Sequence, residues 1–425
     1  MIKARLEAAL AALAVDAQLL QDFLALCDCG GRRAGTPSER AALKLVHERL
    51  AAINSSATVV PVAYAGWRCS EAALTLEDGT AIACNALLGS QSTPAQGIAA
   101  EVIDLGRGKP EDFERVASDI SARFVLVRHE YPFSAVHVHR RRKYGWAMER
   151  GAAGFIIANP LPGAGPVSGS SGRGGHAGIP AVAIDFESAM LLAACGSRRA
   201  RVHLKLDSED YAAETGVAIL DLPGQTDAWV ALSAHLDGHD LAESAMDNAT
   251  GVAVVLAVAR ALAPLIADCR RGLKVCLFSA EEWALAGSRE YLDRMSEYER
   301  NSIALNINLD TVGGDARLTA LTSEFPCLEA FVRNAAATVG IALDTYAPMM
   351  PNSDHYNFAR HAIPALRLVA GFNRPECNVK YILTRGDTRD NVKLAELQSA
   401  AALTATLLLR ALTAGDEAMA ALRQK

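Results

Sequence analysis

The chain has 425 residues, of which 51% are hydrophobic and 21% are charged, and its formal net charge is −6. This length and composition are typical of a globular protein with room for two domains and a full hydrophobic core. The negative balance gives no global attraction to nucleic acid. We therefore expect a small-molecule substrate, no nucleic-acid partner and no membrane partner, with a homo-oligomer as an open alternative.

The first segment, residues 1 to about 55, has a helical pattern interrupted by CGGRRAGTPSER, where Thr36 or Ser38 is suited to cap the second helix. Its opening stretch carries Glu7 and Asp16 around a short apolar run and no small-residue cleavage site, which indicates an amphipathic helix and not a signal peptide. No apolar run in the sequence reaches the length expected of a membrane span. The nine cysteines are an odd count that favours reduced thiols. Together these features favour a cytoplasmic protein.

Short apolar runs separated by glycine and proline turns come next. The runs with this texture are IAAEVIDLG, ARFVLVRHE, AAGFIIAN and IPAVAID. They predict a smaller α/β domain inserted into a larger one, over residues 89–212. The glycine-rich stretch SGSSGRGGHAG inside it does not stand between a strand and a helix, as a phosphate-binding loop would.

From Val217 onward, fully apolar strands alternate with amphipathic segments of helix length. The strand patterns are DAWVALSAH, LKVCLFSA, SIALNINLD and PALRLVAG. This alternation predicts an α/β fold with a mixed, mainly parallel central sheet flanked by helices, built from residues 1–88 and 213–425. In such sheets ligands bind at the carboxyl ends of the strands.

Acidic residues and an imidazole stand at the ends of three of these strands. His235 ends the first strand, and Asp247 begins the helix that follows it. Glu281 and Glu282 follow the second strand, and Asp310 follows the third. Any one of them alone would be an ordinary loop carboxylate or a helix cap. Because the carboxylates would repel one another and resist ionisation without a cation, the set predicts a divalent metal site.

The same residues resemble the co-catalytic zinc aminopeptidases of peptidase clan MH, the family of aminopeptidase Y, glutamate carboxypeptidase and glutaminyl cyclase. The motifs that carry the resemblance are HLD…MDN, SAEEW…AGS, NLD and SDHYNFA, with RRAGTPSERAA near the start. GAAGFIIAN and GIPAVAI resemble a protease-associated domain. The resemblance implies the zinc-peptidase fold with a protease-associated insert.

The resemblance also implies residue roles. Glu281 is the general base that takes a proton from water, and Asp237 orients His235 without binding the metal itself. The implied metal ligands, with Asp247 as the bridge between two ions, are His235, Asp247, Asp310 and Glu282.

One position departs from the family pattern. The last ligand of the family is a histidine that opens an HTxxDT motif, and here YILTRGDTRDNV places Leu383 at that position, with Thr384 and Asp387 in register. Leucine has no lone pair to offer a metal. We therefore expect one divalent ion, manganese or zinc, and a second ion bound weakly or not at all.

Three residues are candidates for substrate contacts. Arg289 lies seven residues after Glu282, on the same helical face, where it would grip a substrate carboxylate; a surface salt bridge is the alternative. His355, in SDHYNF, is a candidate for a substrate or supporting contact, with a purely structural role as the alternative. His239 is the best unassigned histidine near the metal, and simple exposure is its alternative.

The site predicts a metallohydrolase of C–N bonds, and three functions compete. Ranked first is hydrolytic deamination of a small aromatic amine acid resembling 5-nitroanthranilate, with metal-activated water at a mononuclear site. Leu383 favours it, because aminopeptidases of the family hold the α-amine near the second metal. The second function is a metallo-aminopeptidase that releases N-terminal residues. The third is a non-catalytic metal-binding protein on a peptidase fold, against which the intact Glu281 argues.

Overall fold

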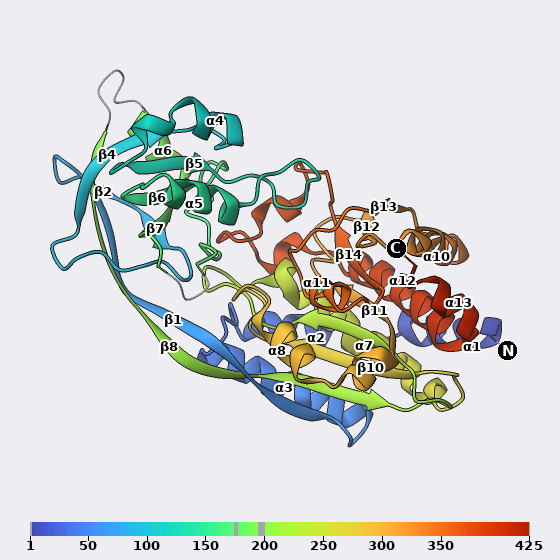
Figure 1. Ribbon diagram of the computed structural model, residues 1–425. Coiled ribbons are helices and arrows are strands. Elements are labelled where there is room, and N and C mark those ends of the chain that lie inside the picture. The colour runs from blue at the N-terminus through green and yellow to red at the C-terminus, as the bar shows by residue number, and fades with distance from the viewer. Residues whose placement is uncertain (1, 174–176, 194–199, 425) are drawn as a thin grey trace. The chain divides into compact units, whose positions relative to one another are not determined.

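The computed structural model describes residues 2–173, 177–193 and 200–424, which form two compact units (Figure 1). Unit 1 comprises Met1–Tyr64, Glu214–Ile382 and Asp387–Lys425, and unit 2 comprises Ala65–Ala213 and Leu383–Gly386. The long strands β1 (Thr58–Leu76) and β8 (Arg201–Leu222) contribute residues to both units. The insert expected over residues 89–212 falls inside unit 2. Residues 174–176 of the glycine-rich stretch and Cys195 lie outside the described residues.

The sheet of unit 1 is mixed and mainly parallel, in the order β13-β12-β14-β11-β9-β10-β8, which confirms the predicted fold class. Strand β9 pairs in parallel with β10 and β11, and β11 pairs in parallel with β14. Strands β8 and β12 run antiparallel to β10 and β14. The bounds are β9 (Trp229–His235), β10 (Gly272–Phe278), β11 (Ile303–Leu309), β12 (Leu318–Leu321), β13 (Leu343–Tyr346) and β14 (Ala365–Ala370).

Helices cover this sheet in two groups. Helices α7 and α12 pack against β9 and β11, with α1 and α2 packed on them, while α11 packs on β11 and β14 beside α8. The α-helices of unit 1 are α1 (Ile2–Ala14), α2 (Ala17–Asp28), α3 (Pro37–Ile53), α7 (Thr250–Ile266), α8 (Ala286–Arg294), α9 (Glu297–Ser302), α10 (Pro326–Thr338), α11 (His355–Arg360), α12 (Leu394–Thr413) and α13 (Asp416–Ala421). Shorter helical turns are η2 (Ala245–Ala249), η3 (Asn378–Tyr381) and η4 (Arg389–Asn391).

Helix α3 begins where the sequence predicts. Thr36 is its N-cap, because the Thr36 hydroxyl accepts the backbone N–H of Glu39 at 3.3 Å, and a proline occupies the first turn. The other candidate, Ser38, accepts the backbone N–H of Arg32 at 2.8 Å instead. The buried carboxylate of Glu39 accepts the hydroxyl of Ser279, directly after β10, at 2.8 Å. The N-terminal segment is thereby tied to the carboxyl end of the central sheet.

Helix α7 is apolar almost throughout because it is a core helix. An 18-residue window of the continuous stretch Ala245–Ile266 has a mean hydropathy of 2.0, and the stretch would span a membrane by length and composition alone, contrary to the sequence expectation. The bent pair Ala4–Ala14 and Ala17–Asp28 passes the same test when taken together. In the fold, however, 72% of the most apolar window of Ala245–Ile266 is buried, and α7 packs on the three central strands. This burial is what a core helix of a globular unit requires.

Unit 2 has its own sheet, in the order β8-β4-β5-β6-β7-β3. Strands β4 to β7 pair in parallel and correspond to the four predicted apolar runs, whereas β3 and β8 run antiparallel to their neighbours. The bounds of the strands are β2 (Ala81–Ile82), β3 (Cys84–Ala86), β4 (Ile98–Asp104), β5 (Phe124–Arg128), β6 (Gly154–Ala158) and β7 (Ala181–Ile184). The helices are α4 (Pro110–Arg115), η1 (Ala117–Asp119), α5 (Arg140–Glu149) and α6 (Phe186–Ala193).

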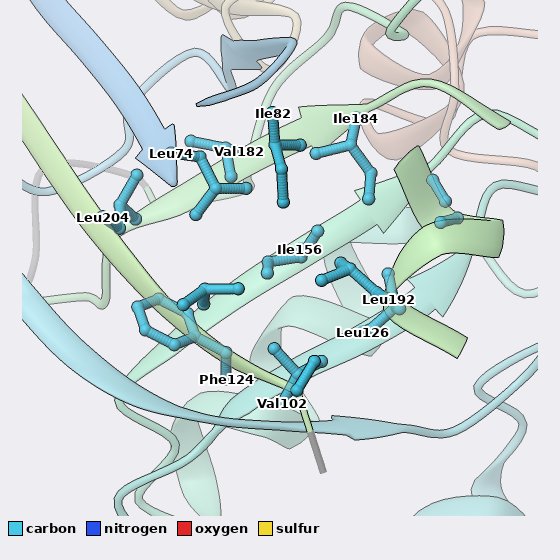
Figure 2. Packing of buried hydrophobic residues seen from close by; sticks show 14 of the residues in the cluster. Leu74, Ile82, Val102, Phe124, Leu126, Ile156, Val182, Ile184, Leu192 and Leu204 are labelled. Atoms are coloured by element: carbon cyan, nitrogen blue, oxygen red, sulfur yellow. The ribbon is translucent and has the colours of Figure 1, made fainter. Parts of the chain in front are cut away.

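One core of unit 2 lies between its sheet and α6. Figure 2 shows Leu126, Ile156 and Val182, from three adjacent strands, converging with Leu192 of α6. These side chains are almost wholly buried. The alternate residues of the same strands, among them Val125, Phe155 and Ala183, form a second buried cluster. Both faces of the parallel sheet are therefore covered, which explains why the four runs are continuously apolar.

A buried ion pair lies within unit 2. Lys143 of α5 has no exposed side-chain surface and donates to Glu130 at 2.7 Å and to the carbonyl of Arg107 at 2.6 Å. Burial pushes the pKa of Glu130 upward, but the hydrogen bonds from Lys143 and Arg107 outweigh burial and hold the pKa below its ordinary value. The pair is compensated on both sides, as a buried charge must be.

We predict that Glu130 makes the stability of unit 2 depend on acid pH. A carboxylate with a depressed folded pKa stabilises the fold above its unfolded pKa of about 4.3, and this stabilisation is lost as the pH falls through the lower folded value. Glu130→Gln should flatten this part of the pH profile. The urea midpoint of peptides from β5, measured by hydrogen-exchange mass spectrometry at several pH values, tests it. Equal pH slopes for wild type and variant would contradict the prediction.

Candidate metal centre

The carboxyl ends of β9, β10 and β11 bring three predicted site residues together. One ligand atom each of His235, Glu281 and Asp310 lies within 4.8 Å of the others, and all three side chains are buried. Nε2 of His235 lies 3.4 Å from Oδ1 of Asp310 and 3.1 Å from Oδ1 of Asp247. The parallel order of the strands places these groups at one edge, as expected.

A second group of ligand atoms lies beside the first. It consists of His239, Asp247 and Glu282, again buried and within 4.8 Å of one another. Nε2 of His239 lies 2.5 Å from Oε1 of Glu282 and 4.0 Å from Oδ2 of Asp247. Asp247 therefore directs one oxygen toward His235 and the other toward His239, which is the geometry of a bridging carboxylate.

The electrostatics of the cluster show the cost of burying these acids together. Burial and the neighbouring Glu282 carboxylate raise the pKa of Asp247. Burial likewise raises the pKa of Glu281 well above its ordinary value, with a further contribution from Glu282. Burial disfavours the charged imidazole of His235, but the carboxylates of Asp310 and Glu281 raise its pKa well above the ordinary value. Such a cluster is stabilised by a positive charge at its centre.

Asp237 supports the site in a different way from the one predicted. It is the backbone carbonyl of Asp237 that lies 3.0 Å from Nδ1 of His235, while its carboxylate oxygen is 3.9 Å from that atom. The carboxylate accepts the backbone N–H groups of Glu281 at 3.0 Å and Glu282 at 3.2 Å. Asp237 thus fixes the histidine tautomer through its main chain and the glutamate pair through its side chain.

Two residues hold Asp247 in place. The carboxylate of Asp387, from the RGDT motif, accepts the backbone N–H of Met246 at 2.7 Å and that of Asp247 at 3.3 Å. The side chain of Asn248 donates to the carbonyl of Leu309 at 2.9 Å and accepts the backbone N–H of Gly251 at the same distance. The Asp247–Asn248 peptide bond is cis. The start of α7 is therefore joined to the end of β11.

The structure also reveals supporting arginines that sequence reasoning missed. Arg367 of β14 is 1% exposed, and its guanidinium lies 3.0 Å from Oδ2 of Asp310. Burial alone would raise the pKa of Asp310, but Arg367 and His235 hold it below the ordinary value. The sequence signal that could have revealed Arg367 is a lone arginine inside the otherwise apolar run PALRLVAG. Arg32, buried in the N-terminal segment, donates to backbone carbonyls on both sides of the loop that carries His239.

The remaining predicted residues take other positions. Arg289 is exposed on α8, and its guanidinium donates to the carbonyl of Ala284 at 3.3 Å, so it is not part of the buried cluster. His355, the first residue of α11, is wholly buried. Burial and the nearby Arg367 lower the pKa of His355 to about 3, which keeps the imidazole neutral. Of the three tentative substrate residues, only His239 contacts the candidate ligands.

The donor set fits divalent cations. Two buried groups each offer one imidazole and carboxylate oxygens at short range, and Asp247 is common to both. Imidazole with carboxylate is a usual ligand set for zinc, and one shared carboxylate is economical for two adjacent ions. The fold and this donor set define a metal-dependent hydrolase.

Comparison with known proteins agrees with this class. The model of peptidase family M28 matches residues 218–408, and that of the PA domain matches residues 79–192. The chain therefore carries a peptidase family M28 domain over residues 218–408 and a PA domain over residues 79–192, which confirms the resemblance stated from the motifs.

Two relatives with known names match more than two thirds of this chain. Aminopeptidase YwaD of Bacillus subtilis is 26% identical over 344 residues, which cover 78% of this chain and 71% of YwaD. The probable lipoprotein aminopeptidase LpqL of Mycobacterium tuberculosis is 28% identical over 301 residues, covering 68% of this chain but 56% of LpqL.

Solved structures share the fold. A peptidase M28 precursor from Shewanella amazonensis superimposes with a TM-score of 0.79 at 22% identity, covering 97% of this chain and 98% of that one. BSAP, a zinc aminopeptidase from Bacillus subtilis, gives a TM-score of 0.73 at 24% identity, covering 96% of this chain and 95% of its own. These similarities support the central sheet and the inserted domain described above.

Proposed function

We propose that the protein is a zinc-dependent aminopeptidase that removes N-terminal residues from peptides. The observation behind the proposal is that two adjacent glutamates have different neighbours. Glu282 contacts His239, while Glu281 lies with His235 and Asp310. One carboxylate is thus placed to bind metal, and its neighbour is placed to handle protons. The names of YwaD, LpqL and BSAP support zinc and peptides over manganese and other amides.

The residues of the chain divide the chemistry between them. A bound zinc ion supplies Lewis-acid polarisation of the scissile carbonyl and lowers the pKa of a water molecule. His235, Asp247 and Asp310 would hold the ion. Glu281 accepts the proton of the attacking water at a carboxylate oxygen and returns it to the departing amine, a task suited to a carboxylate whose pKa burial raises.

Aromatic deamination, the first-ranked hypothesis from the sequence, receives less support than peptide hydrolysis. It depended on Leu383 and on an arginine anchor for a substrate carboxylate. Arg289, the expected anchor, is exposed and bonded to a backbone carbonyl. The curated relatives reported above carry the name aminopeptidase. The aminopeptidase hypothesis therefore replaces the deaminase hypothesis.

We expect the zinc-loaded protein to release p-nitroaniline from leucine p-nitroanilide and to lose this activity when the α-amine of the substrate is acetylated. Acetylation removes the group that distinguishes an aminopeptidase from a general amidase. Absorbance of the released aniline measures the first reaction, and an ammonia assay with a nitro-substituted aminobenzoate measures the rival one. Ammonia release without anilide cleavage would restore deamination.

A further inference from the structure

The sequence has Leu383 at the place where the family pattern has its last metal-binding histidine. We infer that His239 takes over this role, so that His239, Asp247 and Glu282 hold a second divalent ion. This ion would lie beside the one held by His235, Asp247 and Asp310. The inference rests on the proposed function only in assuming that the cluster binds metal, and it changes the expected occupancy from one ion to two.

The distances between the three ligand atoms are close to those expected around a shared ion. A tetrahedral zinc ion about 2.1 Å from each ligand atom requires ligand atoms about 3.4 Å apart. Nε2 of His239 lies 2.5 Å from Glu282 and 4.0 Å from Asp247, so modest side-chain shifts reach this geometry. The two carboxylates offer two negative charges, and a neutral imidazole completes a three-ligand set with an open fourth position, as catalytic zinc sites have.

The backbone that carries His239 is held in place. The N–H of His239 donates to the hydroxyl of Ser244 at 2.8 Å, and that hydroxyl lies 3.2 Å from the His239 carbonyl oxygen. Gly31 packs directly on this backbone: a Cβ at Gly31 would lie 1.7 Å from the same oxygen. Any larger residue at position 31 would displace the loop.

Arg32 fixes the loop at both ends. Its guanidinium donates to the carbonyl of Leu236 at 2.9 Å, before His239, and to that of Ser244 at 2.7 Å, after it. The imidazole is therefore presented to Asp247 and Glu282 by a scaffold formed within unit 1. A ligand held in advance loses little conformational freedom when an ion binds.

The competing explanation is that His239 and Glu282 form a plain hydrogen-bonded pair with no ion between them. That pair would explain the short distance to Glu282. It does not explain why the second oxygen of Asp247 faces the same imidazole. A single ion shared by the three groups explains the orientation of Asp247, and its binding would widen the contact between His239 and Glu282 from 2.5 Å to about 3.4 Å.

Metal content measured by inductively coupled plasma mass spectrometry on zinc-loaded, dialysed full-length protein separates the two explanations. We expect two zinc ions per chain for the wild type and one for His239→Ala. His361→Ala, which removes a partly exposed histidine paired with Asp293, is the matched control and should retain two. His239→Asn, with the same readout and a thermal unfolding curve, guards against misfolding of the alanine variant.

Two outcomes overturn the inference: one ion in the wild type, or two ions in folded His239→Ala. Cleavage of leucine p-nitroanilide by a one-ion wild type would overturn the inference and leave the proposed function standing. Loss of one ion in His239→Ala, with no anilide cleavage by the two-ion wild type, would support the inference and overturn the proposed function.

Discussion

Glu281→Gln should lower the kcat for leucine p-nitroanilide by about two to four orders of magnitude while leaving the metal content unchanged. Glutamine keeps the shape of the side chain but cannot take up a proton. The residue lies with His235 and Asp310, and its backbone N–H is fixed by the carboxylate of Asp237. The variant therefore removes the proton acceptor without removing the support around it.

Steady-state kinetics together with metal analysis test this prediction. Glu297→Gln, which neutralises an exposed glutamate at the start of α9, is the control and should retain wild-type turnover. If Glu281→Gln kept near-wild-type turnover, another group would be moving the proton. If it lost its metal and its activity together, Glu281 would be a ligand and not the base.

Arg32→Met should lower the free energy of unfolding by about 3–5 kcal/mol, because several buried carbonyls would lose their donor at once. One guanidinium donates to the carbonyls of Leu26, Gly30, Leu236, Glu243 and Ser244. The side chain is wholly buried, so water does not readily replace these bonds. Methionine fills similar space without offering any donor.

Urea denaturation of the metal-free protein measures this effect without the added stability that bound ions confer. The adjacent residue gives a matched control. Arg33 forms a partly exposed ion pair with Asp240 at 2.8 Å, so Arg33→Met should cost no more than about 1 kcal/mol. Equal losses for the two variants would show that the five carbonyls do not depend on Arg32.

The sequence predicts most of the sheet and the clustering of the candidate ligands, for a simple physical reason. Strands buried on both faces are continuously apolar, so the histidine that ends β9 and the acids that follow β10 and β11 stand out against them. Parallel strands then bring those ends together without further information. His235, Glu281 and Asp310 could therefore be placed near one another before the fold was known.

The position of His239 could not be predicted in the same way. It lies in a loop whose course is fixed by Gly31 and Arg32, some two hundred residues earlier in the chain. Spacing along the sequence carries no record of such contacts. The inference drawn from Leu383 was limited in the same way. It considered the missing histidine ligand but not the loop that brings His239 close to Asp247, and it therefore favoured deamination.

The supports of Asp247 and His239 are separated widely along the chain, and this sets when the metal centre can assemble. Arg32 leaves the ribosome early, Asp247 midway, and Asp387, which holds the Met246 and Asp247 amides, late. Until Asp387 has emerged, Asp247 lacks the anchor that aims its two oxygens. We therefore expect the candidate metal centre to assemble late, after most of the chain has been synthesised.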